Sequence, residues 1–340
     1  EVEEDLINIG AEYNANTYYD YLRFYFTFLK DDLDSGINIT NKILNINSFN
    51  DKNLSIEKQI VIHEINEKKN QGDYKVWKKL KDIYTSKSSY LMNVLGNKEK
   101  IESYSKGFVE QIYHNNIMKS EKLIIISGSV DSNYIINQLH VSTKGKKVTN
   151  GIYDYNFVIK DDVTVNMDEQ RNNDNGELWL TWIGPGIIHD EKNSAIADLF
   201  CKIANSSESI YYKRLVDSGM INNYDFIYLS QSFSGPIIFI ADYDKERKEE
   251  VASFVQKTLT QLLFSDKDLL RKAKMELRNG LDEYQQREQN KLDIIIKTWA
   301  MSGDVNYYYK YLSDIDNCRL SDIEYFVKKY IGEKNIKIYR

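Results

Sequence analysis

The residues best suited to chemistry are two glutamates in the stretch S-I-E-K-Q-I-V-I-H-E-I-N, residues 55–66. The spacing of its isoleucines predicts a helix, with Ser55 as the N-cap. Glu57 and Glu64 are seven residues apart, or two helical turns, so both carboxylates lie on one helix face. Such a pair is a candidate for metal or acid–base chemistry, although a solvated helix edge is the more common use of charged residues. The sequence of the neighbouring segments is needed to distinguish a chemical role of the two glutamates from a solvated helix edge.

A second element lies about fifty positions before Glu64, where residues 9–17 read I-G-A-E-Y-N-A-N-T. Gly10 is expected to end a short helix over residues 2–9. The excess of Tyr, Phe and Thr over residues 14–29 predicts a strand. A helix over residues 31–45 follows. The acidic helix therefore comes after a helix, a strand and a second helix.

The composition is that of a globular protein with a sizeable core. The chain has 340 residues, of which 42% are hydrophobic and 13% aromatic, which is enough for two domains. A net charge of −6 argues against a nucleic-acid partner, since no basic field dominates. Two cysteines make no disulfide framework, which suggests a reducing compartment or indifference to redox state, and we expect a cytoplasmic location. The sequence has no apolar stretch of membrane-spanning length.

Helical and strand patterns alternate along the chain and predict an α+β fold. The first domain is expected over residues 1–142, a linker rich in Lys, Gly, Thr and Asn over 143–160, and the second domain over 161–340. Residues 123–128 predict an apolar strand. Strands are also predicted at 177–183, 224–231, 236–243 and 335–339, with helices at 193–204 and 321–330. The two halves look like copies of one plan.

The I-G-A-x-x-N-A-x-T element followed by E-K-x-x-V-x-x-E resembles the insulinase/pitrilysin family of zinc metallopeptidases, which includes the mitochondrial processing peptidase subunits and bacterial members. The resemblance implies two related α+β domains, each a mainly antiparallel sheet with helices packed on one face. Together they would form half of a clam-shell. It also implies that Glu64 is a zinc ligand and that Glu57 is a supporting catalytic acid. Asn14 and Ala15 match an edge strand that pairs with extended peptide substrate.

The family's H-x-x-E-H zinc motif is not in this sequence. The four histidines are His63, His114, His140 and His189, and no two have the spacing that a helical two-histidine site needs. The chain opens within an amphipathic helical pattern, so we expect the remaining zinc ligands upstream of Glu1. The family's substrate-binding arginine and tyrosine match Arg214 and Tyr224, which are ten positions apart where the family has seven. A helix-end salt bridge is the simpler use of Arg214.

The resemblance therefore implies a zinc-dependent endopeptidase subunit that cleaves extended peptides in a closed chamber. Because one chain holds at most half of that chamber, we expect a homodimer or a heterodimer with a related subunit. Two alternatives stay open: a non-catalytic partner subunit that binds peptide without metal, and a scaffold or binding protein that keeps only the fold. Other chemistries fit less well, since the sequence has no P-loop, no dinucleotide fingerprint and no G-x-S-x-G.

Overall fold

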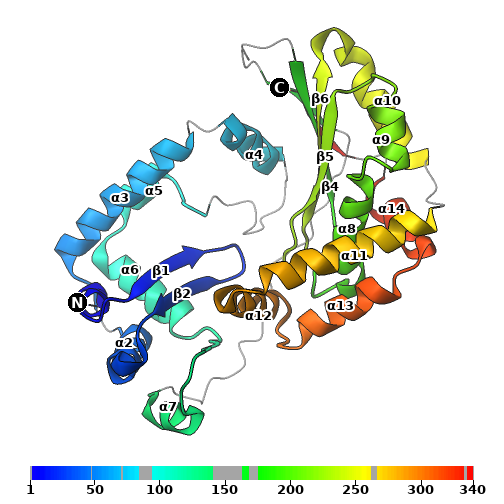
Figure 1. Ribbon diagram of the computed structural model, residues 1–340. Helices are drawn as coiled ribbons and strands as arrows, with labels where there is room; N and C mark the ends of the chain where they lie inside the picture. Colours follow the sequence, from blue (N-terminus) through cyan, green and yellow to red (C-terminus); the bar gives the residue numbers. More distant parts are fainter. Residues whose placement is uncertain are drawn as a thin grey trace. The chain divides into compact units, whose positions relative to one another are not determined.

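A computed structural model of the chain describes residues 2–46, 48–69, 72–83, 94–140, 163–167, 175–261, 266–332 and 335–339 (Figure 1). The chain divides into two compact units: residues 1–75 with 92–153, and residues 76–91 with 154–340. The predicted linker, 143–160, lies outside the described residues. Each unit is described below by itself.

The first unit consists of short helices and one hairpin. Its helices are α1 (Val2–Asn8), α2 (Leu33–Leu44), α3 (Asp51–Lys69), α5 (Lys98–Ser103), α6 (Lys106–Ile112) and α7 (Ser132–Gln138), with α4 (Gly72–Ile83) spanning the boundary between the units. Strands β1 (Glu12–Thr17) and β2 (Leu22–Thr27) pair antiparallel. Gly10 ends α1 as predicted, because its φ of 60° is a left-handed conformation that glycine adopts without strain.

Two strand predictions for this unit are wrong. The single strand predicted over residues 14–29 is a hairpin, because the chain reverses at Tyr19 and Asp20, where the amide of Tyr18 donates to the carbonyl of Tyr21 at 2.9 Å. The apolar residues 123–128 pair with no described strand. Local composition favours an extended chain, but a ladder also needs a partner strand in register.

The second unit is built on one five-stranded sheet in the order β3-β7-β4-β6-β5. The strands are β3 (Val163–Asn166), β4 (Asn175–Ile183), β5 (Asn223–Tyr228), β6 (Pro236–Asp244) and β7 (Ile336–Tyr339). Only the β3–β7 pair is parallel. The helices are α8 (Glu191–Ala204), α9 (Ile210–Leu215), α10 (Lys248–Gln261), α11 (Lys267–Tyr284), α12 (Glu288–Ser302), α13 (Tyr307–Asn317) and α14 (Leu320–Tyr330).

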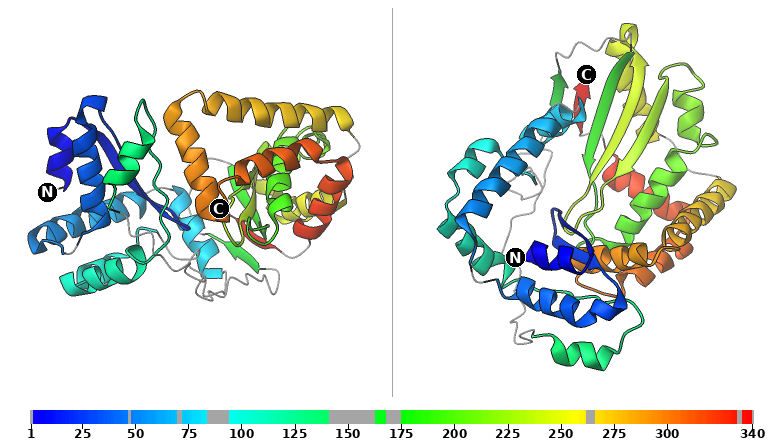
Figure 2. Two further views of the ribbon diagram at one scale, coloured as in Figure 1. Left: turned by 90° about the horizontal axis from the view of Figure 1, so that it is seen from below. Right: turned by 60° about the vertical axis from the view of Figure 1, so that its left-hand side comes forward.

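Helices α8, α11, α13 and α14 lie together on one face of this sheet (Figures 1 and 2). Strand β4 is buried on both faces. Leu178, Leu180 and Trp182 point into the main core against α8, whereas Trp179 packs with Val76 of α4 on the opposite face. This arrangement confirms the predicted α+β class with a mainly antiparallel sheet. Among the described residues, no helix is both long and apolar enough to cross a membrane.

Candidate functional site

Helix α3 holds the two candidate glutamates. Its apolar face buries Ile62 and Ile65 against Ile101 of α5, which turns the opposite face to solvent. Glu57 and Glu64 both lie on the exposed part of the helix. The structure therefore places both carboxylates on an open helix surface, where each is available to a ligand.

The predicted N-cap of α3 is wrong. The helix begins at Asp51, and Ser55 donates its hydroxyl to the Asp51 carbonyl within the first turns. The Asn50 side chain acts as the cap instead, since its Oδ1 accepts from the backbone amides of Lys52 at 2.8 Å and Asn53 at 3.4 Å. The isoleucine pattern begins only at Ile56, several residues after Asn50, so the isoleucine spacing did not identify Asn50 as the cap.

The surroundings of Glu64 do not complete a zinc site within the described residues. His63 is exposed and its Nε2 lies 3.3 Å from Glu67 Oε1, one turn along the helix. In the part of the chain that the structure describes, no three His, Cys, Asp or Glu side chains come close enough to hold a metal ion. Because a catalytic zinc takes three protein ligands, Glu64 by itself does not make the site.

Strand β1 offers one edge of the two-stranded sheet to a further strand. Tyr18 and Tyr21 form a hydrogen-bonded pair at the hairpin end, and the register then alternates along the strand. Asn14, opposite Tyr25, falls on a hydrogen-bonded pair, so its amide and carbonyl face β2. Ala15, opposite Phe24, falls on a non-hydrogen-bonded pair, so its amide and carbonyl face away from β2.

The side chain of Asn14 occupies this outward donor. Its Oδ1 accepts from the amide of Ala15 at 2.8 Å, and both residues are exposed. Two contacts hold the hairpin around this point: Tyr13 donates its hydroxyl to Glu3 at 2.8 Å, and Arg23 donates to Asn16 Oδ1 at 2.8 Å. Asn14 and Ala15 thus have different roles at this edge. The main-chain amide and carbonyl of Ala15 face outward, and the side chain of Asn14 covers that amide.

Arg214 and Tyr224 lie in the second unit and have different surroundings. Tyr224, on β5, is buried, stacks on Phe239 with ring centroids 5.4 Å apart, and donates its hydroxyl to the Ala204 carbonyl at 2.5 Å. Burial raises the pKa of Tyr224 to about 12. Arg214 is exposed at the end of α9. The structure gives Tyr224 a packing role, and the substrate role of both residues stays a prediction.

Comparisons with known proteins agree with the motifs. Residues 1–96 match the family model described as insulinase (peptidase family M16). The chain is 22% identical over 138 residues to the mitochondrial-processing peptidase subunit beta of Dictyostelium discoideum and 23% identical over 130 residues to that of Blastocladiella emersonii. These matches cover 41% and 38% of this chain but only 29% and 28% of the relatives, so the similarity spans less than a third of their length.

Solved structures share the fold over 99% of the chain. A protease from Helicobacter pylori has a TM-score of 0.79 at 13% identity, with 83% of that chain covered. The peptidase M16 inactive domain from Pseudomonas fluorescens has a TM-score of 0.74 at 11% identity, with 82% covered. At these identities the likeness concerns the fold alone. The motifs at residues 9–17 and 57–64 both lie within the matched residues 1–96, so this part of the chain is similar to the insulinase family, peptidase family M16.

Proposed function

We propose that the chain is part of a peptidase subunit that binds extended peptides by adding a strand to the edge of β1 that no described strand covers. The observation that carries this proposal is the outward-facing amide and carbonyl of Ala15 on an exposed strand. Main-chain pairing of this kind is indifferent to most side chains, because successive side chains of the bound strand point away from the ladder. Such a site suits a peptidase that accepts varied sequences.

Binding at this edge requires the Asn14 side chain to release the Ala15 amide. The Asn14–Ala15 hydrogen bond is exposed, so water replaces it at a net cost of about 1 kcal/mol or less. An incoming peptide carbonyl then accepts from the same amide. The Asn14 amide group is left to contact the peptide or water.

The substitution Ala15→Pro tests the proposed edge. It removes the outward donor, while the β1–β2 hydrogen bonds at Asn14 and Asn16 keep their donors. We expect the affinity for a pool of fluorescein-labelled, unstructured 12-residue peptides, measured by anisotropy with the full chain, to fall about five- to tenfold, the equivalent of one net hydrogen bond.

Ala15→Gly is the matched control, because it changes the same side chain but keeps the amide, and its affinity should match that of the parent. Chemical shifts of β2 amides report whether the hairpin survives in each variant. A folded Ala15→Pro variant with unchanged peptide affinity contradicts the proposal, as does the absence of peptide binding by the parent chain.

For the catalytic step, the proposal makes Glu64 a zinc ligand and Glu57 its supporting acid in a zinc-dependent endopeptidase. The site would also need histidine ligands, and no two of His63, His114, His140 and His189 have the spacing of the H-x-x-E-H motif. Support comes from the family match over residues 1–96 and from the exposure of both carboxylates on one face of α3. Bound zinc would supply an activated water and polarise the scissile carbonyl.

Glu64→Gln in the full-length protein should lower the zinc content and abolish peptide cleavage, because the amide is a neutral and weaker ligand. Metal analysis of the purified protein measures the first effect directly. Glu67→Gln is the control, since Glu67 is exposed on the same helix and pairs with His63. Unchanged zinc stoichiometry in Glu64→Gln rules out the assigned role.

The second candidate is a non-catalytic partner subunit that binds peptide without metal. It is favoured by the histidine positions, 63, 114, 140 and 189, which contain no H-x-x-E-H spacing. Zinc analysis and peptide cleavage by the full-length protein separate the two: zinc with cleavage identifies the enzyme, whereas peptide binding without zinc identifies the partner. In either role we propose a dimer, with itself or with a related subunit, which sedimentation equilibrium tests.

A further inference from the structure

A cavity of about 540 Å³ lies within the second unit, between the first half of α11 and the turn that joins α13 to α14. Four of its lining residues are cationic: Lys267, Arg271 and Lys274 on α11, and Arg319 before α14. The three α11 residues follow one helix face, since they are separated by four and three positions. Arg319 faces them from the other wall. Among the residues that the structure describes, the lining includes no aspartate or glutamate.

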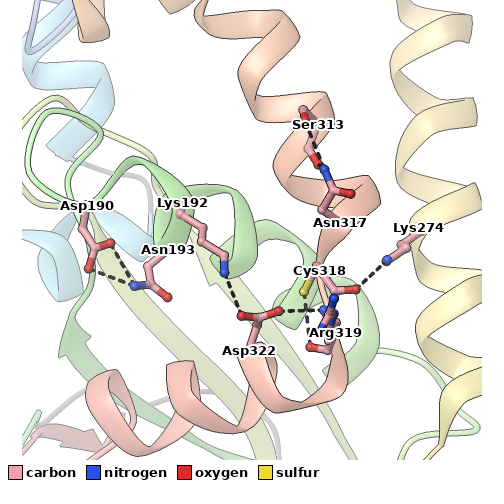
Figure 3. Close-up of polar contacts among 9 residues, drawn as sticks. All are labelled: Asp190, Lys192, Asn193, Lys274, Ser313, Asn317, Cys318, Arg319 and Asp322. Atoms are coloured by element: carbon pink, nitrogen blue, oxygen red, sulfur yellow. Dashed lines mark hydrogen bonds and ion pairs between the residues drawn. The ribbon is translucent and has the colours of Figure 1, made fainter.

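Lys274 fixes the geometry of the cavity. Its Nζ donates to the backbone carbonyl of Cys318 at 2.6 Å (Figure 3). It also donates to the backbone carbonyl of Asp316 at 2.8 Å, and the two hydrogen bonds tie α11 to the α13–α14 turn. Both acceptors are neutral, so these hydrogen bonds leave the positive charge of the lysine uncompensated. The walls are therefore held in place by a group that also contributes charge.

The carboxylates near this cavity offset only part of its positive charge, since Asp322 interacts with the charge of Arg319 as well as with that of Lys192. Asp322 accepts from the Arg319 backbone amide at 2.8 Å and pairs with Lys192 at 2.8 Å (Figure 3). Asp268 lies 3.7 Å from Arg271, but both side chains are largely exposed, and such surface pairs are worth little. Positive charge thus remains in excess at the cavity.

Beneath the cationic groups the lining is apolar. Leu270 and Cys318 are buried, and Leu320 is half-buried. Burial raises the pKa of the Cys318 thiol to about 11, so the thiol is neutral at physiological pH and adds no negative charge. The cavity therefore combines an apolar floor with a cationic rim.

We propose that this cavity binds a small amphipathic anion. The apolar body of the ligand rests on Leu270 and Leu320, and its carboxylate or phosphate group meets Arg271 and Arg319. Guanidinium groups bind such oxyanions through paired, charge-assisted hydrogen bonds. The volume is within the range of small-molecule sites. The site is separate from β1 and does not depend on the peptide-binding proposal.

Titration calorimetry on the 340-residue chain tests the inference with four probes: hexyl phosphate, hexanoate, inorganic phosphate and hexan-1-ol. We expect hexyl phosphate or hexanoate to bind at least tenfold more tightly than inorganic phosphate and hexan-1-ol, because only the first two have both an anionic and an apolar part. Comparing the two amphipathic probes identifies the preferred anionic group. The inference is overturned if none of the four binds, or if inorganic phosphate or hexan-1-ol binds as tightly as the amphipathic probes.

The double variant Arg271→Gln and Arg319→Gln should weaken binding at least tenfold. Ser321→Trp, which fills the cavity without removing charge, should do the same. The control, Lys213→Gln with Lys257→Gln, removes two exposed charges from α9 and α10 and should leave affinity unchanged. Denaturation midpoints confirm that each variant is folded. Parent-like affinity in the folded double variant or in folded Ser321→Trp assigns the binding elsewhere and refutes the inference.

Discussion

Asp198 on α8 provides a sharp test of the packing in the second unit. Its Oδ2 accepts from the Tyr311 hydroxyl at 3.0 Å, across the contact between α8 and α13. Burial raises the pKa of Asp198 to about 6, while the Tyr311 hydrogen bond and the charge of Lys297 oppose that rise. The titratable groups that face this carboxyl are Cys201 of α8, Tyr228 of β5, Lys297 of α12, and Tyr307 and Tyr311 of α13.

The sign of the effect follows from proton binding. The folded pKa of Asp198 lies above its unfolded value of 3.8, so the folded state binds the proton more tightly. The stability from this group is fully present below about pH 3.8 and is lost as the pH rises through about 6. A shift of two units corresponds to roughly 3 kcal/mol. Because Asp198 keeps partial exposure, we expect about 1–3 kcal/mol.

The perturbation is Asp198→Asn, which keeps the shape and an acceptor for Tyr311 but carries no charge. At pH 8 the variant should be more stable than the parent by about 1–3 kcal/mol, and the difference should vanish near pH 4. Urea denaturation followed by tryptophan fluorescence between pH 4 and 8 measures it. Asp217→Asn is the control, an exposed aspartate in the turn after α9 whose replacement should leave the pH profile parallel to the parent. A difference independent of pH, or a destabilised Asp198→Asn at pH 8, refutes the reasoning.

Two further predictions concern backbone positions. Gly186→Ala should destabilise the second unit by several kcal/mol in urea denaturation, because a Cβ there overlaps the Phe233 backbone carbonyl. Gly280→Ala, in α11 with nothing near its Cβ, should instead stabilise by about 0.5–1 kcal/mol, and equal effects at the two sites would contradict the packing. Asn50→Ala should cost about 1 kcal/mol by removing the α3 cap, whereas Ser55→Ala should stay within about 0.5 kcal/mol. If amide exchange in the first turn of α3 is faster in Ser55→Ala than in Asn50→Ala, the cap assignment is incorrect.

The orientation of Ala15 shows why the local sequence was not sufficient to predict the peptide-binding edge of β1. The motif at residues 9–17 identified Asn14 and Ala15 together as an edge. Only the hairpin register separates them, since adjacent residues in a strand turn their amides to opposite sides. A proline at Asn14 would break the β1–β2 ladder, whereas a proline at Ala15 removes the outward donor alone. The two-residue turn at Tyr19 and Asp20 sets that register.

The sequence alone indicated the resemblance to the insulinase family and predicted the α+β class and the helices and strands with clear periodicity. Helix α8, strands β4, β6 and β7, and the end of α1 at Gly10 follow from side-chain spacing and backbone preference, which are properties of a short segment. Tertiary structure decided the burial of Tyr224, the raised pKa of Asp198 and the cationic cavity beside α11. Each of these depends on side chains far apart in the chain meeting in space, and no local pattern encodes such a meeting.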